Sequence, residues 1–261
     1  MAISAGEGDP KGGVGIHRRP NRLSPLGVIL LGLEITFLGC QAGTQSGPDF
    51  AVRRKAMVAD QILARGIRDS LVLKAMSEVP RHLFVPAGLV DEAYRDYPLP
   101  IGEGQTISQP YIVALMTECL ALKGGEKVLE VGTGSGYQAA VLGRIAAGVF
   151  TIEINAALAR EAASKLERLG FPNVRVRSGD GFFGWPGEAP FDAIIVTAAV
   201  PEFPPALFAQ LAEGGRLVVP IGDVQTYQQL TVVTKKNGQP RIERVLDVRF
   251  VPMTGEILKR K

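Results

Sequence analysis

Short apolar runs alternate with helical patterns through the second half of the chain. The alternation predicts strands at 127–131, 149–153, 174–177, 191–197 and 215–220, and helices at 137–147, 156–169 and 204–212. Strand, helix and strand repeated in this order predict a parallel sheet with helices on both faces. Two more apolar runs, 229–235 and 241–250, flank Asn237-Gly238, a pair typical of a tight hairpin. We therefore expect a doubly wound α/β fold whose mostly parallel, seven-stranded sheet ends in antiparallel strands.

A helical extension is predicted ahead of this sheet. Residues 51–65 carry apolar side chains on a helical period and stop at Gly66, which favours a C-terminal cap. Asp69-Ser70 then cap a second helix, which must end before Pro80. From 94 to 110 the chain shows no sustained period, so we expect a long ordered loop there. Pro110 is placed to begin a helix that runs to about residue 122.

The first fifty residues differ from the rest. Basic residues precede a short apolar run at 26–40 that resembles a secretory signal, with Leu38-Gly39-Cys40 similar to a lipoprotein cleavage site. The run is too short for a spanning helix and is interrupted by Glu34. The alternative is an over-long start, with Met57 or a nearby residue as the true beginning. We predict an extension and linker over 1–50, a single domain over 51–261, and a cytoplasmic protein, with export or lipid anchoring through Cys40 as the alternative.

Composition narrows the chemistry. The chain is 46% hydrophobic and 21% charged, with a formal charge of +3, so it favours a folded core and gives no reason to expect a nucleic-acid partner. It has two cysteines, Cys40 and Cys119, and two histidines, His17 and His82. These supply neither a zinc cluster nor a disulfide framework, so we expect no metal.

A glycine-rich turn follows the first strand of the sheet. Gly132, Gly134 and Gly136 stand at alternate positions between that strand and the next helix. Such glycines let the backbone approach a ligand closely, where a side chain would block it. Tyr137 stands where a dinucleotide fingerprint needs its last glycine, and the Gly-Lys-Ser/Thr of a P-loop is absent. Glu130, just ahead of the turn, would attract an ammonium group and repel phosphate.

Acidic residues follow the next two strands. Glu153 ends the second strand, where a carboxylate can accept hydrogen bonds from ribose hydroxyls. Gly179-Asp180 follow the third, where the aspartate could reach an adenine amino group. The carboxyl ends of parallel strands meet at one edge of the sheet, which predicts a nucleoside-binding edge. Taken alone, Glu153 would better fit a solvated acid at a strand end, and each acid is ordinary by itself.

These motifs resemble those of class I S-adenosylmethionine-dependent methyltransferases. Segments 79–86, 104–111 and 250–255, in this order and spacing, further resemble the protein-L-isoaspartate O-methyltransferase family. The resemblance covers roughly residues 51 to 256, and Thr106-Ile107-Ser108-Gln109-Pro110 is its most specific part. It implies methyl transfer from S-adenosylmethionine to the α-carboxyl of L-isoaspartyl residues, and less well of D-aspartyl residues, in damaged proteins and peptides. The methyl ester then collapses to a succinimide, which begins repair.

The resemblance also implies roles for single residues. Ser108 would hold one oxygen of the reacting carboxylate, beside Thr106, Ile107 and Gln109 as substrate contacts, and Thr254 would lie near the cofactor. The alternative for Ser108 is a cap on the helix that begins at Pro110. A carboxylate is already ionised at neutral pH, so the reaction needs no general base, which fits the shortage of histidine.

Two other functions remain open at this point. The first is methylation of RNA, DNA or a small molecule, although Thr197-Ala198-Ala199-Val200-Pro201 lacks the Asn/Asp-Pro-Pro-Tyr element typical of amino methylation. The second is a membrane-tethered module that binds the cofactor without turnover, which would require a lipidated Cys40.

Overall fold

The computed structural model describes residues 49–223 and 225–259. These residues belong to one unit, Ser46–Lys261. The predictions for Cys40 and for the signal-like run lie outside the described residues. The predicted linker is one or two residues too long, because Asp49 already caps a helix by accepting hydrogen bonds from the backbone N–H groups of Ala51 and Val52.

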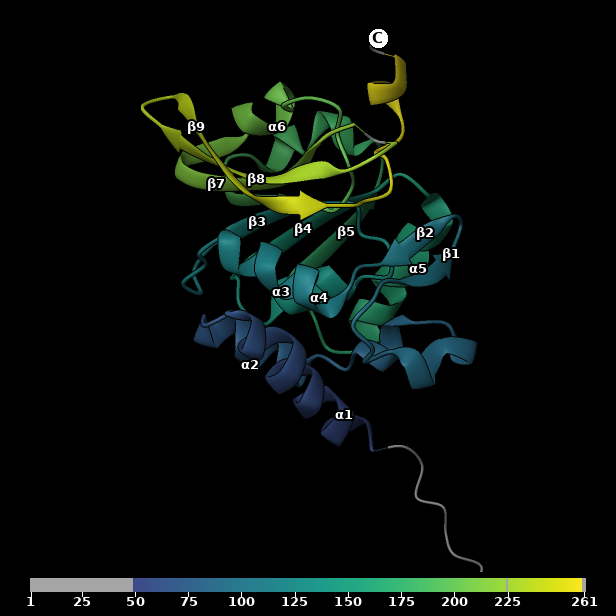
Figure 1. The fold of residues 1–261 in the computed structure, drawn as a ribbon. Coiled ribbons are helices and arrows are strands. Elements are labelled where there is room, and N and C mark those ends of the chain that lie inside the picture. The colour runs from purple at the N-terminus through teal and green to yellow at the C-terminus, as the bar shows by residue number, and fades with distance from the viewer. Residues whose placement is uncertain (1–48, 224, 260–261) are drawn as a thin grey trace, which may run out of the picture. The chain divides into compact units, whose positions relative to one another are not determined.

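The centre of the fold is a seven-stranded sheet with the order β5-β4-β3-β6-β7-β8-β9 (Figure 1). Its strands are β3 (Lys127–Val131), β4 (Gly148–Glu153), β5 (Val174–Ser178), β6 (Phe191–Val196), β7 (Leu211–Gly222), β8 (Gln228–Lys236) and β9 (Gln239–Val248). The first five pair in parallel, and β8 and β9 are antiparallel to their neighbours. The predicted fold class is confirmed, including the hairpin turn, where Asn237 and Gly238 both have positive φ.

Helices cover both faces of this sheet. On one face lie α3 (Pro110–Cys119), α4 (Tyr137–Gly143) and α5 (Ala156–Arg168); on the other lie α6 (Pro205–Ala209) and the 3-10 turns η5 (Gly181–Phe183) and η6 (Pro186–Glu188). Side chains of a strand point alternately to the two faces, so Val128 packs with the first group and Leu129 with the second. Burial on both faces explains why these strands read as continuous apolar runs. The helices α3, α4 and α6 end earlier than predicted, at residues 119, 143 and 209.

The predicted N-terminal helices are confirmed, with one variation. The first runs through α1 (Phe50–Ala56), a π-helical stretch η1 (Met57–Ile62) and a 3-10 turn η2 (Leu63–Arg65), and ends at Gly66 with φ of 98°. In the second, α2 (Ser70–Glu78), the Asp69 carboxylate accepts from the N–H groups of Leu71 and Val72, as predicted for a cap. The 3-10 turns η3 (Arg81–Phe84) and η4 (Ala87–Glu92) follow.

The segment predicted as a long loop contains a small hairpin instead. Its strands are β1 (Leu99–Gly102) and β2 (Gln105–Ile107), which pair only with each other, with Leu99 opposite Ile107. Strands of three or four residues interrupted by proline and glycine give no readable alternation, so the pattern could not show them. Leu99 and Ile107 are both buried in the main hydrophobic cluster, which holds the hairpin against the rest of the fold.

Beyond β9 the chain returns to the carboxyl edge of the parallel strands. The backbone N–H of Ala199 donates to Val251 and that of Met253 donates to Ala199, both at 2.8 Å. A last 3-10 turn, η7 (Glu256–Lys259), follows. In the part of the chain that the structure describes, no helix has both the length and the apolar character needed to cross a bilayer.

Candidate active site

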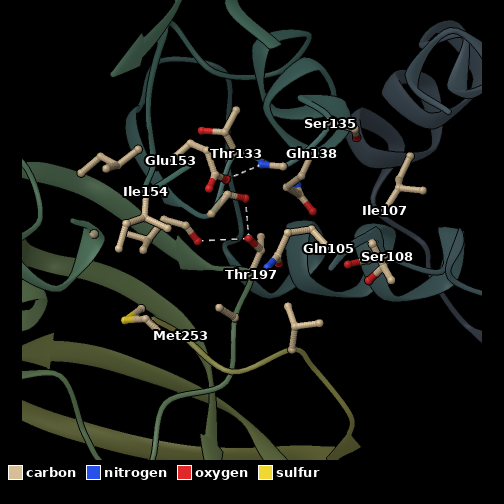
Figure 2. A pocket seen from close by; sticks show the side chains of 18 of the residues that line it. Gln105, Ile107, Ser108, Thr133, Ser135, Gln138, Glu153, Ile154, Thr197 and Met253 are labelled. Atoms are coloured by element: carbon tan, nitrogen blue, oxygen red, sulfur yellow. Dashed lines mark hydrogen bonds between the residues drawn. The ribbon is translucent and has the colours of Figure 1, made fainter. Parts of the chain in front are cut away.

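A cavity opens at the carboxyl ends of β3, β4 and β6, where the strand order reverses direction. It encloses roughly 820 Å³, counting its open mouth. Two walls of different construction face it (Figure 2). The sheet wall consists of lining residues in 131–138, 152–154, 181 and 197–198, and the hairpin wall consists of residues 105–108. Residues 251–254 from the C-terminal segment complete the lining. The reversal of strand order is the usual place for a ligand in an open parallel sheet.

The three glycines of the turn have different tasks. Gly132 and Gly134 line the cavity with φ of 101° and 51°, values that other residues rarely adopt. A Cβ on Gly132 would collide with the Thr197 hydroxyl, so this glycine lets β3 and β6 approach each other closely. Gly136 does not line the cavity. It precedes α4, and a Cβ added to it would lie 3.3 Å from Leu166 of α5. Only the first two glycines of the turn therefore line the cavity.

Glu153 is fixed at the end of β4 with both carboxylate oxygens in use. Oε2 accepts from the backbone N–H of Gly134 and Oε1 from that of Asn155, each at 2.9 Å. The side chain is 6% exposed and lines the cavity. Each carboxylate oxygen has further lone pairs, so Glu153 can still accept hydrogen bonds from a bound ligand while it holds the glycine turn in place.

Glu130 lies behind the cavity and is not part of its lining. It is fully buried on β3, and neither carboxylate oxygen has a hydrogen-bond partner among the described residues. Burial raises the pKa of Glu130 to about 8; the Thr151 hydroxyl opposes this rise and the negative charge of Glu153 adds to it. A carboxyl group with this pKa is mostly neutral at pH 7, so the structure does not present it as a fixed negative charge facing a ligand.

The third strand end contributes less to the cavity than the sequence suggests. Gly181 lines it, whereas Gly179 and Asp180 do not. The Asp180 carboxylate accepts from the backbone N–H groups of Phe182 and Glu256, at 2.9 and 2.7 Å, and so joins η5 to the C-terminal segment. Thr254, from that segment, lies in the lining.

The hairpin wall brings Thr106, Ile107 and Ser108 to the cavity. Figure 2 shows Ile107 and Ser108 on the opposite side from Glu153 and Ile154. Ser108 does not cap the following helix, because α3 begins after Gln109 and has no side-chain cap. The Ser108 hydroxyl makes no hydrogen bond within the described residues. Gln109 does not line the cavity, since its side chain turns toward Asp96 instead.

Sequence reasoning missed several lining side chains. Among them are Gln105, Thr133, Ser135, Gln138, Thr197 and Met253. Thr197 follows the fourth strand at the same edge as Glu153, so the strand-end argument could have found it. Its hydroxyl lies 2.6 Å from the Gly132 carbonyl and 3.0 Å from that of Val131, which ties β6 to the glycine turn. Gln138 comes from α4 and donates to Thr117 at 2.9 Å; no local pattern indicates this contact.

The titratable groups around the cavity are few. No cluster of three or more His, Cys, Asp or Glu side chains that could hold a metal exists within residues 49–223 and 225–259. His82 stacks on Phe50 and its Nδ1 lies 2.7 Å from the Tyr94 hydroxyl. Burial and the positive charge of Arg54 lower the pKa of His82, and it is not among the lining residues. Among the described residues, the site therefore has polar donors and acceptors for binding, but no histidine placed as a base.

An open parallel sheet with a glycine turn after its first strand and an acidic side chain ending its second is typical of α/β proteins that bind a nucleoside-containing cofactor, class I S-adenosylmethionine-dependent methyltransferases among them. The family model for protein-L-isoaspartate(D-aspartate) O-methyltransferase matches residues 52–258. The chain belongs to this family and is a methyltransferase.

Individual relatives agree with the family match. The chain is 60% identical to protein-L-isoaspartate O-methyltransferase 2 of Shewanella sediminis over 79% of this chain and 84% of that protein. It is 54% identical to protein-L-isoaspartate O-methyltransferase of Opitutus terrae, over 78% and 87%. A solved protein-L-isoaspartate O-methyltransferase superposes with a TM-score of 0.73 at 34% identity, over 79% of this chain and 68% of that one.

A second solved structure contains a ligand. A Plasmodium falciparum chain named as a beta-aspartate methyltransferase, in complex with S-adenosyl-L-homocysteine, superposes with a TM-score of 0.67 at 29% identity. The match covers 77% of this chain and 98% of that one. In this chain, Gly132, Gly134 and Glu153 all line the cavity, and the acceptor oxygens of Glu153 suit a ligand of this kind.

Proposed function

We propose that this chain transfers a methyl group from S-adenosylmethionine to the α-carboxyl of L-isoaspartyl residues, and less well of D-aspartyl residues, in damaged proteins and peptides. The observation that carries the proposal is the place of Ser108. Its hydroxyl is free of protein partners within the described residues, and it lies on the cavity that the glycine turn also lines.

When bound, S-adenosylmethionine supplies an electrophilic methyl group on a positively charged sulfur. Gly132, Gly134, Glu153 and Thr254 are the residues that we expect to hold it, since all four line the cavity. Glu130, Gly136, Gly179 and Asp180, also predicted as contacts, do not line it. We propose that these four support the site from behind: Gly136 through packing on α5 and Asp180 through its hydrogen bonds to η5 and Glu256.

On the hairpin wall, Ser108 would donate its hydroxyl proton in a hydrogen bond to one carboxylate oxygen and leave the other oxygen facing the methyl group. Thr106 and Ile107 line the same wall and would flank the substrate. A carboxylate and a sulfonium lose their charges as they react, so water, which solvates both, slows the step. Apolar lining residues such as Val113, Val131 and Ile152 help to exclude that water.

The carboxylate needs no base, because its ordinary pKa near 4 keeps it ionised at neutral pH. The arrangement of His82, away from the cavity, is consistent with this chemistry. Positioning and exclusion of water are then the main contributions that the side chains make to the rate.

The decisive experiment offers the full chain a radiolabelled methyl donor with two peptides that differ only in an isoaspartyl or a normal aspartyl residue. We expect label in the isoaspartyl peptide alone. Equal label in both peptides, or label only in added RNA, would remove the assignment and favour another class of methyltransferase.

A variant separates positioning from cofactor binding. Ser108→Ala should lower turnover of the isoaspartyl peptide by about tenfold to a hundredfold, since a lost positioning contact misplaces the carboxylate. Calorimetry should show unchanged affinity for S-adenosylhomocysteine. Ser77→Ala is the control, because the Ser77 hydroxyl donates to Lys74 on α2, outside the cavity. Loss of cofactor affinity in Ser108→Ala would contradict the assigned role.

The domain boundaries are part of the same proposal. We propose that residues 51–261 form one methyltransferase domain and that residues 1–50 are an extension. The family match over 52–258 supports this division. Attachment to a membrane through Cys40 stays a prediction, since that residue lies outside the described part of the chain.

A further inference from the structure

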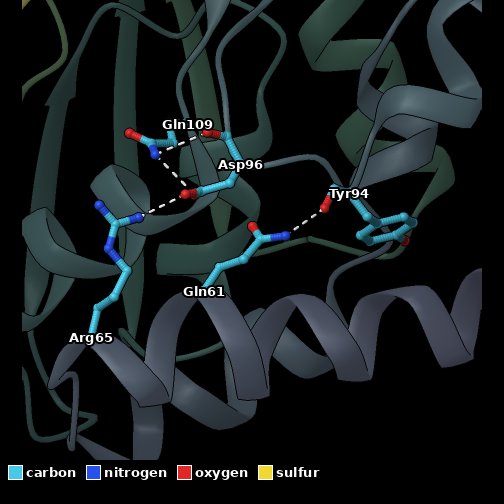
Figure 3. Close-up of polar contacts among 5 residues, drawn as sticks. All are labelled: Gln61, Arg65, Tyr94, Asp96 and Gln109. Atoms are coloured by element: carbon cyan, nitrogen blue, oxygen red, sulfur yellow. Dashed lines mark hydrogen bonds and ion pairs between the residues drawn. The ribbon is translucent and has the colours of Figure 1, made fainter.

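Gln109, next to Ser108, is directed away from the cavity and into a polar network. Its Nε2 donates to the Asp96 carboxylate Oδ1 at 2.8 Å and to the Asp96 carbonyl at 3.1 Å (Figure 3). Two hydrogen bonds to one residue fix both the direction of the side chain and the distance between residue 109 and the loop that precedes β1. Gln109 thus anchors the backbone immediately after Ser108.

Asp96 is shared between two parts of the fold. Its Oδ1 accepts from Gln109, and its Oδ2 forms an ion pair with Nη1 of Arg65 at 2.8 Å. Arg65 comes from η2, at the end of the first helical segment, and its guanidinium lies 3.8 Å from the centre of the Tyr111 ring. Figure 3 shows Asp96 between Arg65 and Gln109. The N-terminal helical segment is therefore linked to α3 on both sides of Pro110.

A second contact ties the same loop to the same helical segment. Gln61, one turn before Arg65, donates from Nε2 to the Tyr94 carbonyl at 2.8 Å. Residues 94 and 96 are thus both held by side chains of residues 61 and 65, as Figure 3 shows. The loop that carries Asp96 is therefore held by contacts other than those with Gln109, so Asp96 can hold the Gln109 side chain in place.

Ser108 lies between two fixed neighbours. Ile107 is 4% exposed and pairs with Leu99 in the hairpin, and Gln109 is held by Asp96. Because Ser108 has no hydrogen bond of its own within the described residues, its position depends on these two neighbours. Ile107 is held by burial, and Gln109 by the network.

We propose that Arg65, Asp96 and Gln109 form a positioning network that sets the place of the Ser108 hydroxyl in the substrate cavity. None of the three lines the cavity, so they act on the reaction through Ser108. The inference rests on the proposed role of Ser108 with the substrate carboxylate. It also gives Gln109 a different task from the substrate contact that the sequence suggested.

The test measures steady-state kinetics on the isoaspartyl peptide with the full chain. Asp96→Ala and Gln109→Ala should each lower kcat/KM by about tenfold, because a small displacement of a positioning group costs much of its effect. Affinity for S-adenosylhomocysteine should stay within about twofold, and the melting temperature within about 3 °C, since exposed ion pairs contribute little to stability. Asp96→Asn, which keeps an oxygen acceptor for Gln109, should recover part of the activity.

Asp91→Ala is the matched control. Asp91 also pairs with an arginine of the first helical segment, Arg53, at 3.3 Å, and both side chains are exposed. This pair has no contact with Gln109 in the described structure, so its loss should leave kcat/KM unchanged. An equal loss of activity in Asp91→Ala and Asp96→Ala would show that the helical segment acts only on general stability, which would overturn the proposal.

A double-mutant cycle decides whether the network works through Ser108. If it does, Asp96→Ala should have little further effect in a Ser108→Ala background. A full tenfold additional loss in that background would overturn the inference while the role of Ser108 stands. Wild-type activity in Asp96→Ala and Gln109→Ala would do the same. Wild-type activity in Ser108→Ala would instead refute the proposed function of that serine and the network with it.

Discussion

The two walls of the cavity are built in opposite ways. The sheet wall is held by backbone hydrogen bonds of buried parallel strands: Gly132 donates to Ile152 at 2.8 Å and Thr197 to Val131 at 2.9 Å. The hairpin wall consists of a strand paired with only one other strand and a segment tied down by Asp96, whose side chain is 40% exposed. The first wall therefore depends on main-chain pairing, and the second depends on a few side-chain contacts.

The largest effect should come from filling the space beside the sheet wall. Gly134→Val places a branched side chain at φ of 51°, where the added Cβ would lie 3.4 Å from the Ile101 side chain. We expect affinity for S-adenosylhomocysteine to fall at least about a thousandfold, because the side chain occupies the ligand's place. Calorimetric titration measures this loss.

Gly238→Val is the control for backbone strain alone. Gly238 has φ of 72° in the β8–β9 turn, and nothing lies within 4 Å of its added Cβ. This variant should lose some stability but keep its affinity within about twofold. If Gly134→Val also bound S-adenosylhomocysteine with normal affinity, the glycine turn would not be the binding surface. The contrast between the two walls would then say nothing about where the ligand binds.

The next effect concerns Glu130, the buried acid behind the sheet wall. The pKa of Glu130 rises on burial from its ordinary value of 4.5 to about 8. The folded form therefore holds its proton more tightly than the unfolded form, so this stabilising effect is complete below pH 4.5 and is lost as the pH rises to 8. Between pH 5 and pH 8, wild type should lose about 3 kcal/mol of stability relative to Glu130→Gln.

Chemical denaturation of the ligand-free protein at several pH values measures this difference. Glu167→Gln, on the exposed side of α5, removes one carboxylate of the same type and serves as the control. A difference between Glu130→Gln and wild type that does not change with pH would show that Glu130 is ionised in the folded protein.

A smaller effect is expected where the carboxylate supports the turn. The Glu153 carboxylate accepts hydrogen bonds from the backbone N–H groups of Gly134 and Asn155. In Glu153→Gln, the amide has only one oxygen, so its NH₂ group must face one of these two N–H donors. We expect affinity for S-adenosylhomocysteine to fall about tenfold and stability to fall by about 1 to 2 kcal/mol. Glu161→Gln on α5 is the control, and an unchanged affinity in Glu153→Gln would mean that the turn keeps its shape without that residue.

The smallest effect on stability should belong to the hairpin wall. Arg65→Met removes the ion pair with Asp96 but keeps an apolar contact with Tyr111. Because the pair is half exposed, we expect the free energy of unfolding to change by less than about 1 kcal/mol in urea denaturation. A loss above about 3 kcal/mol in the free energy of unfolding would show that the side-chain contacts of the hairpin wall contribute as much to stability as core packing does. The contrast between the two walls would then be wrong.

The contrast also explains what the sequence could predict. Strands buried on both faces read as apolar runs, and the ends of such strands share one edge, so the sheet, Gly132, Gly134 and Glu153 were accessible from the pattern alone. Ser108 came from the family resemblance. The pattern could not show that the Asp180 carboxylate would accept hydrogen bonds from the N–H groups of Phe182 and Glu256. An acid after a strand can bind either a ligand or nearby backbone N–H groups.

The hairpin wall depends on contacts that leave no local signal. Arg65 and Asp96 are far apart in sequence, as are Gln61 and Tyr94, and nothing in their residue types indicates that they pair. Strands β1 and β2 are too short to show alternation and gain their place from the burial of Leu99 and Ile107. Long-range side-chain contacts of this kind become visible only when the elements are placed in space.

The C-terminal segment has a consequence for the order of biosynthesis. Residues 251–254 line the cavity, and the backbone N–H of Glu256 donates a hydrogen bond to the Asp180 carboxylate. A chain emerges from the ribosome beginning at its N-terminus, so the seven strands can be complete while this side of the cavity is still missing. A nascent chain would acquire its ligand pocket only after residue 256 has emerged, which delays methylation until the enzyme has been fully assembled up to that point.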